Sequence, residues 1–301
     1  IKAASQCISE GICDPILLGN IDRIEAVKEE LGLSFTCEEI DVRYDPRRRG
    51  SYAEELHNIR GRKGITLEDA IRRMKNSTYF APMMVHMGNA DGYLGGVSHH
   101  YPDIVKPCLQ IIGPEKDSHR IVGMYMMTVN GELMFIGDAT INIYPDSRTL
   151  AEIAVQTAKV ARRFGVKPKV AMLSFSNFGT SSEMRTDRVE EAISIARELD
   201  PELIIDGPMQ ADTALVSEIQ KEYPFMSFEG PANVLICPNL ASANIAYKLL
   251  QRIAGAEMTG PILEGLSKPA HVLQRGDSVR DVVHMAAICA VDAQRHDWQK
   301  L

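Results

Sequence analysis

Six side chains that could bind an anion or move a proton stand close together near the end of the chain. Residues 267–278 are predicted to form one loop between a short apolar run and a final helix. The segment and the first helical turn carry Lys268, His271, Gln274, Arg275, Asp277 and Asp281. Because α/β folds bind ligands where strand ends meet helix starts, this cluster predicts a site for an anionic substrate with a carboxylate as base.

Asp281 also has a purely structural interpretation. The sequence Ser278-Val-Arg-Asp281 resembles a capping box, in which the first and fourth residues bond to each other's backbone at the start of a helix. Asp281 can cap the helix and also serve as a base, and the residues alone leave both roles open.

Residues 174–182, Ser-Phe-Ser-Asn-Phe-Gly-Thr-Ser-Ser, join a predicted strand to a predicted helix. Their hydroxyls, Gly179 and the following helix N-terminus could hold a phosphate through backbone N–H groups. The segment matches neither a Walker A loop nor a GxGxxG fingerprint, which disfavours nucleotide folds of those kinds. The alternative, favoured by composition alone, is an ordinary βα turn with an N-cap.

The glycine-rich stretch Gly95-Gly96-Val97-Ser98-His99-His100 follows an apolar strand. Paired glycines permit close approach to a ligand, and either histidine could shuttle a proton. The alternative is a turn with surface histidines. Adjacent histidines point in different directions, and no HExxH motif or structural Cys/His spacing occurs, so no zinc site is predicted.

Other charged residues have competing interpretations. Asp138, Asp206 and Asp212 stand near predicted strand ends, where they could do acid–base work; Asp206 could equally stabilise a turn before Pro208, and Asp212 is favoured as a helix cap. The basic runs at 47–49 and 60–63 could bind phosphate, although such runs are usually solvated surfaces.

Composition limits the possible classes of function. The chain has 301 residues, of which 45% are hydrophobic, and this length predicts two domains. Its formal charge of −7 argues against a general affinity for nucleic acid or membrane surfaces. Six cysteines without a CxxC pair are typical of reduced thiols in a cytoplasmic protein. No apolar run reaches membrane-spanning length, and no signal peptide is recognisable.

Predicted helices and strands alternate along most of the chain, which favours βαβ units and parallel sheets. Residues 44–50 are predicted as a loop, and Asn130-Gly131 as the turn of an antiparallel hairpin at a sheet edge. The predicted helices are 2–10, 21–31, 52–60, 66–74, 147–164, 184–199, 211–221 and 240–254; the predicted strands are 15–19, 37–42, 121–129, 132–136, 169–175, 202–206 and 233–237.

Several sequence blocks resemble the phosphate acetyltransferase/butyryltransferase family, in the right order and almost from end to end. They are Pro15-Ile-Leu-Leu-Gly-Asn20, Arg62-Lys-Gly-Ile-Thr-Leu67, Asn89-Ala-Asp-Gly92, Leu109-Gln-Ile-Ile112, Leu173-Ser-Phe-Ser176, Asp206-Gly-Pro-Met-Gln-Ala-Asp212, Asn244-Ile-Ala-Tyr-Lys-Leu249 and Gly260-Pro-Ile-Leu263. The family's first strand should precede Ile1, so we expect the chain to be a fragment of a longer protein.

More narrowly, the chain resembles the C-terminal domain of multi-domain NADP-dependent malic enzymes. This resemblance rests on Arg162-Arg-Phe-Gly-Val-Lys-Pro-Lys169, Leu173-Ser-Phe-Ser-Asn-Phe-Gly179, Lys268-Pro-Ala-His-Val-Leu273 and Val291-Asp-Ala-Gln294. It implies a domain that binds acetyl-CoA as a regulator and supports oligomerisation. NADP and a divalent metal would belong only to N-terminal malic-enzyme domains absent from this chain, and no cofactor is expected in this domain.

The resemblance implies two three-layer αβα domains with mostly parallel sheets flanking a cleft, like isocitrate and isopropylmalate dehydrogenases. We expect residues 1–116 with 268–301 to form the first domain, to which the C-terminal helix returns. Residues 117–267 would form the second, which the family uses for dimerisation, with the hairpin at Asn130-Gly131 near the interface.

The family's site residues transfer only in part. The resemblance assigns phosphate binding to Arg60 and to Lys106, where the family has a second arginine. Arg275 and Asp281 match an Arg–Asp pair whose Asp takes the proton from the CoA thiol, but Gln274 stands where a serine steadies the tetrahedral intermediate. The remaining ligand-lining positions expected from the sequence are Ser98, Ser174, Ser176 and Gly179.

Lys106 replaces a family arginine, whose guanidinium can form two hydrogen bonds to phosphate, and Gln274 replaces a family serine hydroxyl. Because both groups have changed, we expect a regulatory, acetyl-CoA-sensing domain with weak or no transferase activity. One alternative is an active phosphate acetyltransferase that uses acetyl-CoA and phosphate, with Asp281 as the base. Another is a pure oligomerisation scaffold. In each case the chain would be cytoplasmic and form a homo-oligomer.

Overall fold

The computed structural model describes residues 1–116, 118–129, 131–179 and 184–298. The chain divides into two units. Unit 1 contains Ile1–His119 and Leu266–Leu301, and unit 2 contains Arg120–Gly265. These bounds differ by a few residues from the predicted 1–116 with 268–301 and 117–267.

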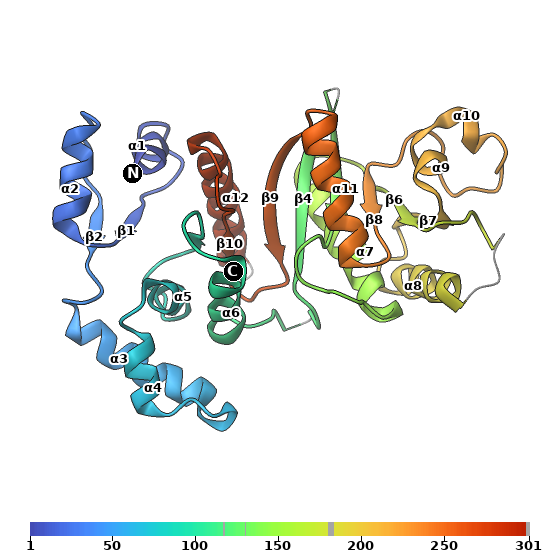
Figure 1. The fold of residues 1–301 in the computed structure, drawn as a ribbon. Helices are drawn as coiled ribbons and strands as arrows, with labels where there is room; N and C mark the ends of the chain where they lie inside the picture. Colours follow the sequence, from blue (N-terminus) through green and yellow to red (C-terminus); the bar gives the residue numbers. More distant parts are fainter. Residues whose placement is uncertain (117, 130, 180–183, 299–301) are drawn as a thin grey trace. The chain divides into compact units, whose positions relative to one another are not determined.

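Unit 2 is built on one six-stranded sheet with the strand order β7-β6-β8-β5-β4-β9 (Figure 1). Strands β5, β8, β6 and β7 run parallel, whereas β4 pairs antiparallel with both β5 and β9. The strands are β4 Val122–Val129, β5 Glu132–Gly137, β6 Lys169–Leu173, β7 Ile204–Met209, β8 Val234–Ile236 and β9 Glu257–Glu264. The helices are α7 Ser147–Arg163, α8 Met184–Leu199, α9 Ala211–Leu215, α10 Ser217–Gln220 and α11 Leu240–Ile253.

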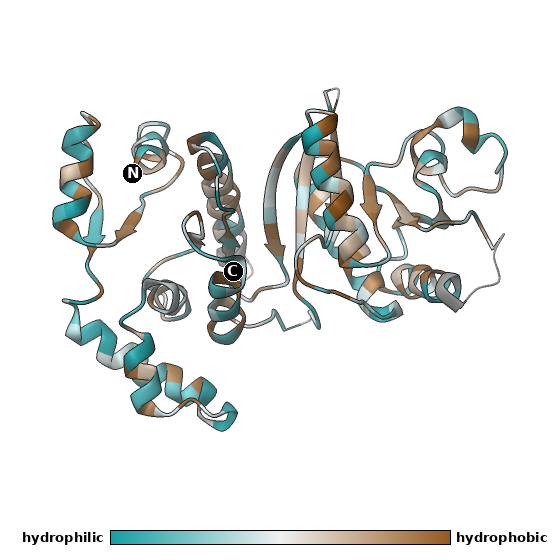
Figure 2. Ribbon diagram, in the orientation of Figure 1, coloured by the Kyte–Doolittle hydropathy of each residue, from teal (hydrophilic) through white to brown (hydrophobic). Residues whose placement is uncertain are grey.

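Helices cover both faces of this sheet. Consecutive strand residues point to opposite faces, so each strand can pack against helices on both sides. Phe135 of β5 packs on Phe164 at the end of α7, with ring centroids 6.1 Å apart. On the other face, Tyr125 of β4 stacks on Tyr247 of α11 at 4.3 Å. Figure 2 shows hydrophobic colouring on much of the sheet and α11. Unit 2 is therefore a three-layer α/β unit.

The described strands of unit 1 form two separate parallel pairs rather than one continuous sheet. Strand β1 (Ile16–Leu18) pairs with β2 (Glu38–Ile40), and β3 (Tyr93–Gly95) pairs with β10 (Ala270–Val272). The helical elements are α1 Lys2–Ser9, α2 Ile21–Glu30, α3 Pro46–Arg60, the 3₁₀ turn η1 Gly61–Lys63, α4 Leu67–Arg73, α5 Ser77–His86, α6 Tyr101–Ile111 and α12 Val279–Trp298. The prediction of an α/β fold with mostly parallel sheets is confirmed.

The predicted loop at residues 44–50 is wrong, since α3 already begins at Pro46. Asp45 caps the helix by accepting a hydrogen bond from the backbone N–H of Arg48 at 3.0 Å. Proline suits the first helical position because its missing N–H would have no partner there. The run of arginines thus starts a helix.

None of the helices in the described part of the chain combines the length and apolar character needed to cross a membrane.

Candidate functional site

Two loops of unit 1 leave the same edge of a small parallel sheet. Strands β3 and β10 run side by side, with Leu94 opposite His271. Because the strands are parallel, the loops that follow them emerge together at their carboxyl ends. One loop leads into α6 and carries Ser98; the other leads into α12 and carries Gln274 and Arg275.

The two loops touch through Gly96. Its φ is +134°, and a Cβ added there would lie 2.4 Å from the carbonyl oxygen of Leu273. The N–H of Leu273 donates to the carbonyl of Gly95 at 2.8 Å. Gly96 therefore permits close packing of backbone on backbone, which holds the Ser98 loop beside the Gln274 loop.

Two members of the predicted terminal cluster have structural roles instead. Lys268 Nζ donates to the carbonyls of Val85 and His86, at 2.8 and 3.2 Å, where α5 ends. His271 is fully buried in β10, and its Nε2 lies 3.1 Å from Asp292 Oδ2 of α12. The single loop predicted at 267–278 is wrong, because β10 lies within it.

The remaining cluster occupies the turn before α12 and its first helical turn. The N–H of Gln274 donates to Asp277 Oδ2 at 2.7 Å, and the N–H of Asp277 donates back to the Gln274 carbonyl at 3.2 Å. Burial raises the pKa of the Asp277 carboxyl, and the nearby charge of Asp281 adds to this rise, whereas the hydrogen bond from Gln274 opposes it. Arg275 is exposed between them.

Asp281 forms the predicted capping box. Its Oδ2 accepts hydrogen bonds from the N–H and the hydroxyl of Ser278, at 2.8 and 2.7 Å, and its own N–H donates to Ser278 Oγ at 3.3 Å. The structural interpretation of Asp281 is thus confirmed. The contacts leave Oδ1 available for a second role. Gln274, Arg275 and Asp281 lie together on one short stretch of backbone.

Arg60 is the last residue of α3, and η1 follows directly. Its Nε is buried and has no hydrogen-bond partner among the described residues. A buried donor of this kind is costly unless a ligand or water accepts from it. The neighbouring Arg62 and Lys63 are exposed.

Ser98 and Lys106 are both exposed. Ser98 Oγ lies 3.2 Å from His99 Nδ1 in the loop before α6. Lys106 lies in α6. Exposure leaves both side chains accessible to a ligand.

The loop carrying Ser174, Ser176 and Gly179 belongs to unit 2 and follows β6; residues 180–182 of the predicted segment lie outside the described residues. The N–H of Ser174 donates to the carbonyl of Met209 at 2.8 Å, which ties the loop to the end of β7. Ser176 is buried, yet its hydroxyl has no hydrogen-bond partner among the described residues. Gly179 has a φ of +77°.

The predicted hairpin residue Asn130 also lies outside the residues that the structure describes.

Two candidate acids of unit 2 are bound to backbone. Asp138 is buried and accepts from the N–H groups of Ile141 and Asn142, at 3.0 and 2.8 Å. Burial raises the pKa of Asp138, and these hydrogen bonds oppose the rise. Asp206 accepts from the N–H groups of Gly207 and Ser227, at 2.9 and 2.6 Å. The Asp138 contacts stabilise the turn that follows β5. Asp206 lies within β7 and ties this strand to Ser227, so the predicted turn before Pro208 is wrong.

Asp212 lies within the first turn of α9, whose N-cap is Gln210, so it is not the cap that the sequence favoured.

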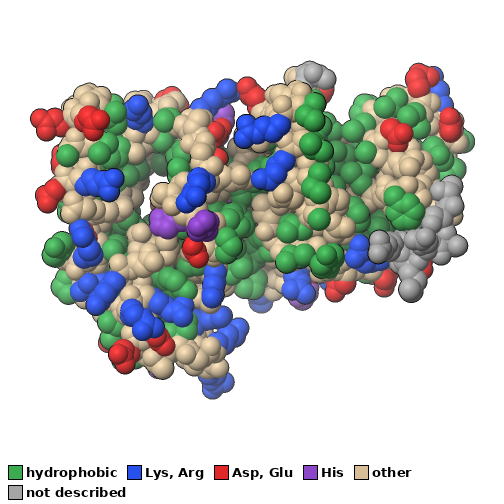
Figure 3. Space-filling model, viewed as in Figure 1, with side chains coloured by type: hydrophobic (Ala, Val, Ile, Leu, Met, Phe, Trp, Pro, Cys, Tyr) green, Lys and Arg blue, Asp and Glu red, His purple; other side chains and the backbone are tan. Residues whose placement is uncertain are grey.

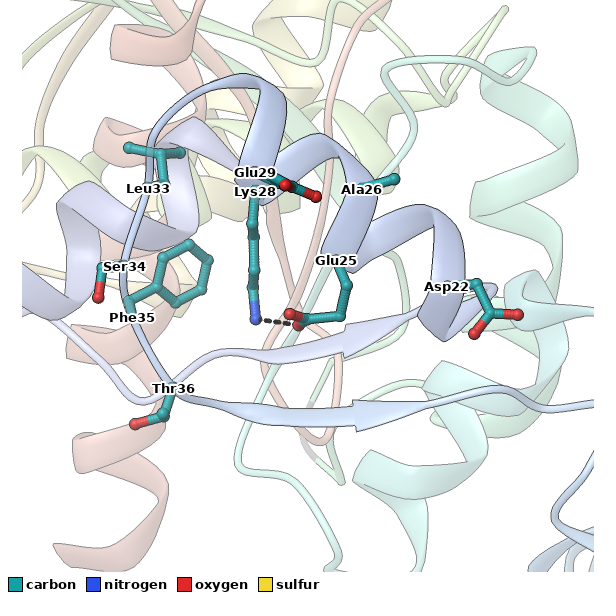
Figure 4. Close-up of a pocket in the computed structure, with 9 residues that line it drawn as sticks. All are labelled: Asp22, Glu25, Ala26, Lys28, Glu29, Leu33, Ser34, Phe35 and Thr36. Atoms are coloured by element: carbon teal, nitrogen blue, oxygen red, sulfur yellow. Dashed lines mark hydrogen bonds and ion pairs between the residues drawn. The ribbon is translucent and has the colours of Figure 1, made fainter.

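A surface pocket of about 810 Å³ lies between α2 and residues 33–36 of unit 1 (Figure 4). Lys28 pairs with Glu25 at 2.8 Å and also with Glu39, which raises the pKa of the lysine. Its ammonium lies 4.6 Å from the ring centroid of Phe35. The pocket contains none of the predicted site residues. Since the lysine that lines it is already paired and acidic groups surround it, it does not suit an anionic substrate.

The fold and these side chains define an α/β protein with arginine, amide and carboxylate groups at the carboxyl edges of parallel strands. The chain belongs to the phosphate acetyl/butaryl transferase family, which it matches over residues 1–290.

Curated relatives match nearly the whole chain. A phosphate acetyltransferase of Corynebacterium glutamicum is 38% identical, covering 97% of this chain and 89% of the relative. Another, from Thermoanaerobacterium thermosaccharolyticum, is 40% identical over 98% of this chain and 92% of its own length. A crystal structure of a phosphotransacetylase from Streptococcus pyogenes has a TM-score of 0.90 at 36% identity, covering 98% of this chain and 90% of that chain.

These relatives overturn the prediction of an acetyl-CoA-sensing malic-enzyme domain with weak or no transferase activity. The matched relatives bear the name of the transferase itself, and this chain spans about nine-tenths of their length. The changes at Lys106 and Gln274 are compatible with activity, because a lysine still binds phosphate and an amide still donates a hydrogen bond.

Proposed function

We propose that this protein is an active phosphate acetyltransferase that interconverts acetyl-CoA and phosphate with acetyl phosphate and CoA. The observation that carries the proposal is the similarity to curated phosphate acetyltransferases along nearly the whole chain. The reaction transfers an acyl group without oxidation or reduction.

In the proposed mechanism, Asp281 removes the proton from the CoA thiol, and the thiolate attacks the carbonyl carbon of acetyl phosphate. The new C–S bond gives a tetrahedral intermediate; the C–O bond to phosphate then breaks, and the proton passes from Asp281 to the leaving phosphate. The Ser278 contacts support this role because they orient the carboxylate while engaging only Oδ2.

Cations and an amide would stabilise the charges in this reaction. We assign phosphate binding to Arg60, Lys106 and Ser98, with Arg275 beside the reacting groups. The Gln274 amide would donate to the oxyanion of the intermediate, in the role for which the family uses a serine. The hydrogen bond from the Gln274 backbone N–H to Asp277 supports this assignment, because it fixes the backbone that carries the Gln274 side chain. Ser174, Ser176 and Gly179 would contact acetyl-CoA.

We also propose a homo-oligomer formed through unit 2. Three apolar side chains on one face of α11, Ile245, Leu249 and Ile253, are 58%, 51% and 79% exposed. Figure 3 shows hydrophobic side chains along this helix. Contiguous exposed apolar surface favours an interface. Light scattering should give more than one chain per particle, and Leu249→Glu should yield monomers; a monomeric wild type would contradict the assignment.

The experiment that tests the function measures acetyl phosphate formed by the purified protein from acetyl-CoA and inorganic phosphate. We expect sustained turnover and release of one CoA thiol per acetyl phosphate. A folded protein that makes no acetyl phosphate would contradict the proposal and favour the scaffold alternative.

A further inference from the structure

Three aromatic rings cluster in unit 2 beside the loop at residues 174–179. The ring centroid of Phe178 lies 5.1 Å from that of Tyr223 and 5.0 Å from that of Phe225, and the Phe178 and Phe225 planes meet at 82°. Phe225 nevertheless remains 65% exposed. Most of a large ring therefore faces solvent, while Phe178 supports it in an edge-to-face contact.

Polar contacts fix the cluster in place. Asn177 Nδ2 donates to the Tyr223 hydroxyl at 3.1 Å and to Gln210 Oε1 at 3.2 Å. The N–H of Phe178 donates to the carbonyl of Pro208 at 2.8 Å, although Phe178 has a φ of +43°. A non-glycine residue adopts such a backbone only where its surroundings hold it. The rings are thus presented on a preorganised support.

Ser176 provides an independent indication of a ligand. It precedes Asn177 in the same loop and is only 7% exposed, but its hydroxyl has no hydrogen-bond partner among the described residues. Leaving a buried hydroxyl unpaired is costly. A bound molecule with polar groups at this loop would supply the partner.

The location restricts the ligand class. The loop follows β6 and is tied to the end of β7, at the carboxyl ends of parallel strands, where α/β folds hold nucleotides. Exposed aromatic rings bind nucleobases by stacking. The acetyl-CoA of the proposed reaction carries an adenine nucleotide at the end remote from its thiol.

We propose that Phe225 stacks on the adenine ring of acyl-CoA, that Phe178 and Tyr223 hold the Phe225 ring, and that the Ser176 hydroxyl bonds to the same nucleotide. The choice of acyl-CoA rests on the proposed function. The stacking site itself is defined by the contacts of unit 2.

The kinetic test compares acetyl-CoA with acetyl-pantetheine, which has the same thioester but no adenine nucleotide. Phe225→Ala should raise the KM for acetyl-CoA by about 5- to 150-fold, the range that corresponds to one stacked base. Its kcat and its KM for acetyl-pantetheine should stay unchanged, and Phe225→Trp should restore the KM for acetyl-CoA. Phe164→Ala, which removes a partly exposed phenylalanine elsewhere in unit 2, is the matched control and should change neither KM.

A binding measurement separates this inference from the proposed reaction. Calorimetric titration with adenosine 3′,5′-bisphosphate should show binding to the wild type and its loss in Phe225→Ala, whether or not the protein turns over. Ser176→Ala should weaken this binding about 2- to 10-fold without lowering thermal stability, because its hydroxyl has no protein partner to lose. Equal nucleotide binding by wild type and Phe225→Ala, or equal rises in KM for both thioesters, would overturn the stacking site.

Discussion

The carboxylate of Asp281 is held by Ser278 through two hydrogen bonds at one end of α12, from the backbone N–H at 2.8 Å and from the hydroxyl at 2.7 Å. The contact caps the helix and at the same time orients the group proposed as the base. One interaction would thus serve both the stability of the fold and the proposed catalysis.

Ser278→Ala should therefore affect two quantities. Loss of an N-cap hydroxyl lowers the free energy of unfolding by about 0.5–2 kcal/mol. We also expect a lower kcat, because Asp281 loses one anchor. Urea unfolding and steady-state kinetics measure the two effects, and Ser278→Thr should preserve both. A full kcat in Ser278→Ala would show that the cap does not position Asp281.

Arg60 should govern the affinity for phosphate. Its buried Nε has no partner among the described residues, so an anion could satisfy it. Arg60→Ala should raise the KM for phosphate by about 10- to 150-fold, as expected for a hydrogen bond to a charged group. Arg62→Ala removes an exposed arginine two residues away and serves as the control. Equal changes in the two variants would exclude a specific role for Arg60.

Gln274 should act on kcat rather than on substrate affinity. Gln274→Ala removes the proposed oxyanion donor, and such donors contribute about 10²–10³ in kcat. Its backbone N–H remains bonded to Asp277, so the turn should survive. Gln274→Ser should retain part of the activity because a hydroxyl also donates. Comparison of kcat and KM for the three proteins decides the point; an unchanged kcat in Gln274→Ala would remove the residue from the mechanism.

Asp138→Asn should destabilise the protein. The buried carboxylate accepts from several N–H groups, including those of Gly123, Ile141 and Asn142. In asparagine an NH₂ group replaces one carboxylate oxygen, so some of these backbone N–H groups would lose their acceptor. We expect the free energy of unfolding to fall by about 1–3 kcal/mol. Chemical denaturation should reveal the loss, while the exposed Asp212→Asn should unfold like the wild type. Equal stability of all three proteins would contradict this account of Asp138.

Acid should weaken the pair formed by Asp41 and Arg43. Arg43 Nε lies 2.9 Å from Asp41 Oδ1, and hydrogen bonds from the side chain and backbone of Arg43, together with its charge, lower the pKa of the carboxyl from 3.8 to about 2. Because the folded-state pKa lies below the unfolded value, the pair stabilises the fold above about pH 4 and loses this effect as the pH falls toward about 2. Arg43→Gln should reduce this part of the acid dependence of the melting temperature. Arg47→Gln, at an exposed position, should leave it intact; identical profiles for both variants would be the contrary result.

Patterned segments of unit 2 were predictable from sequence. The Asn130-Gly131 signal indicated an antiparallel hairpin, and β4 and β5 do pair antiparallel. The predicted position at a sheet edge is wrong, because β9 pairs with β4 and forms the edge instead. In unit 1, helices α5 and α6 were missed, since Pro82 and Pro107 lie inside them and proline usually ends a helix. Strand β10 was missed because its three residues are too short for a periodic signal.

The candidate site was predictable only where local chemistry decides the structure. Ser278 and Asp281 form their capping box within four consecutive residues, so spacing alone indicated it. The roles of Lys268 and His271 depend on Val85, His86 and Asp292, which are distant in sequence. The unpartnered groups of Arg60 and Ser176 likewise become visible only once burial is known.

The most direct test of the central claim is the rate of acetyl phosphate formation by Asp281→Asn relative to the wild type. In this variant the amide oxygen can still accept the Ser278 hydrogen bonds, but the side chain cannot take a proton. We predict a fall in kcat of about 10²–10⁴, as for loss of a general base. Asp22→Asn, which makes the same change in the first turn of α2, should keep the wild-type rate. Wild-type turnover in Asp281→Asn would contradict the account.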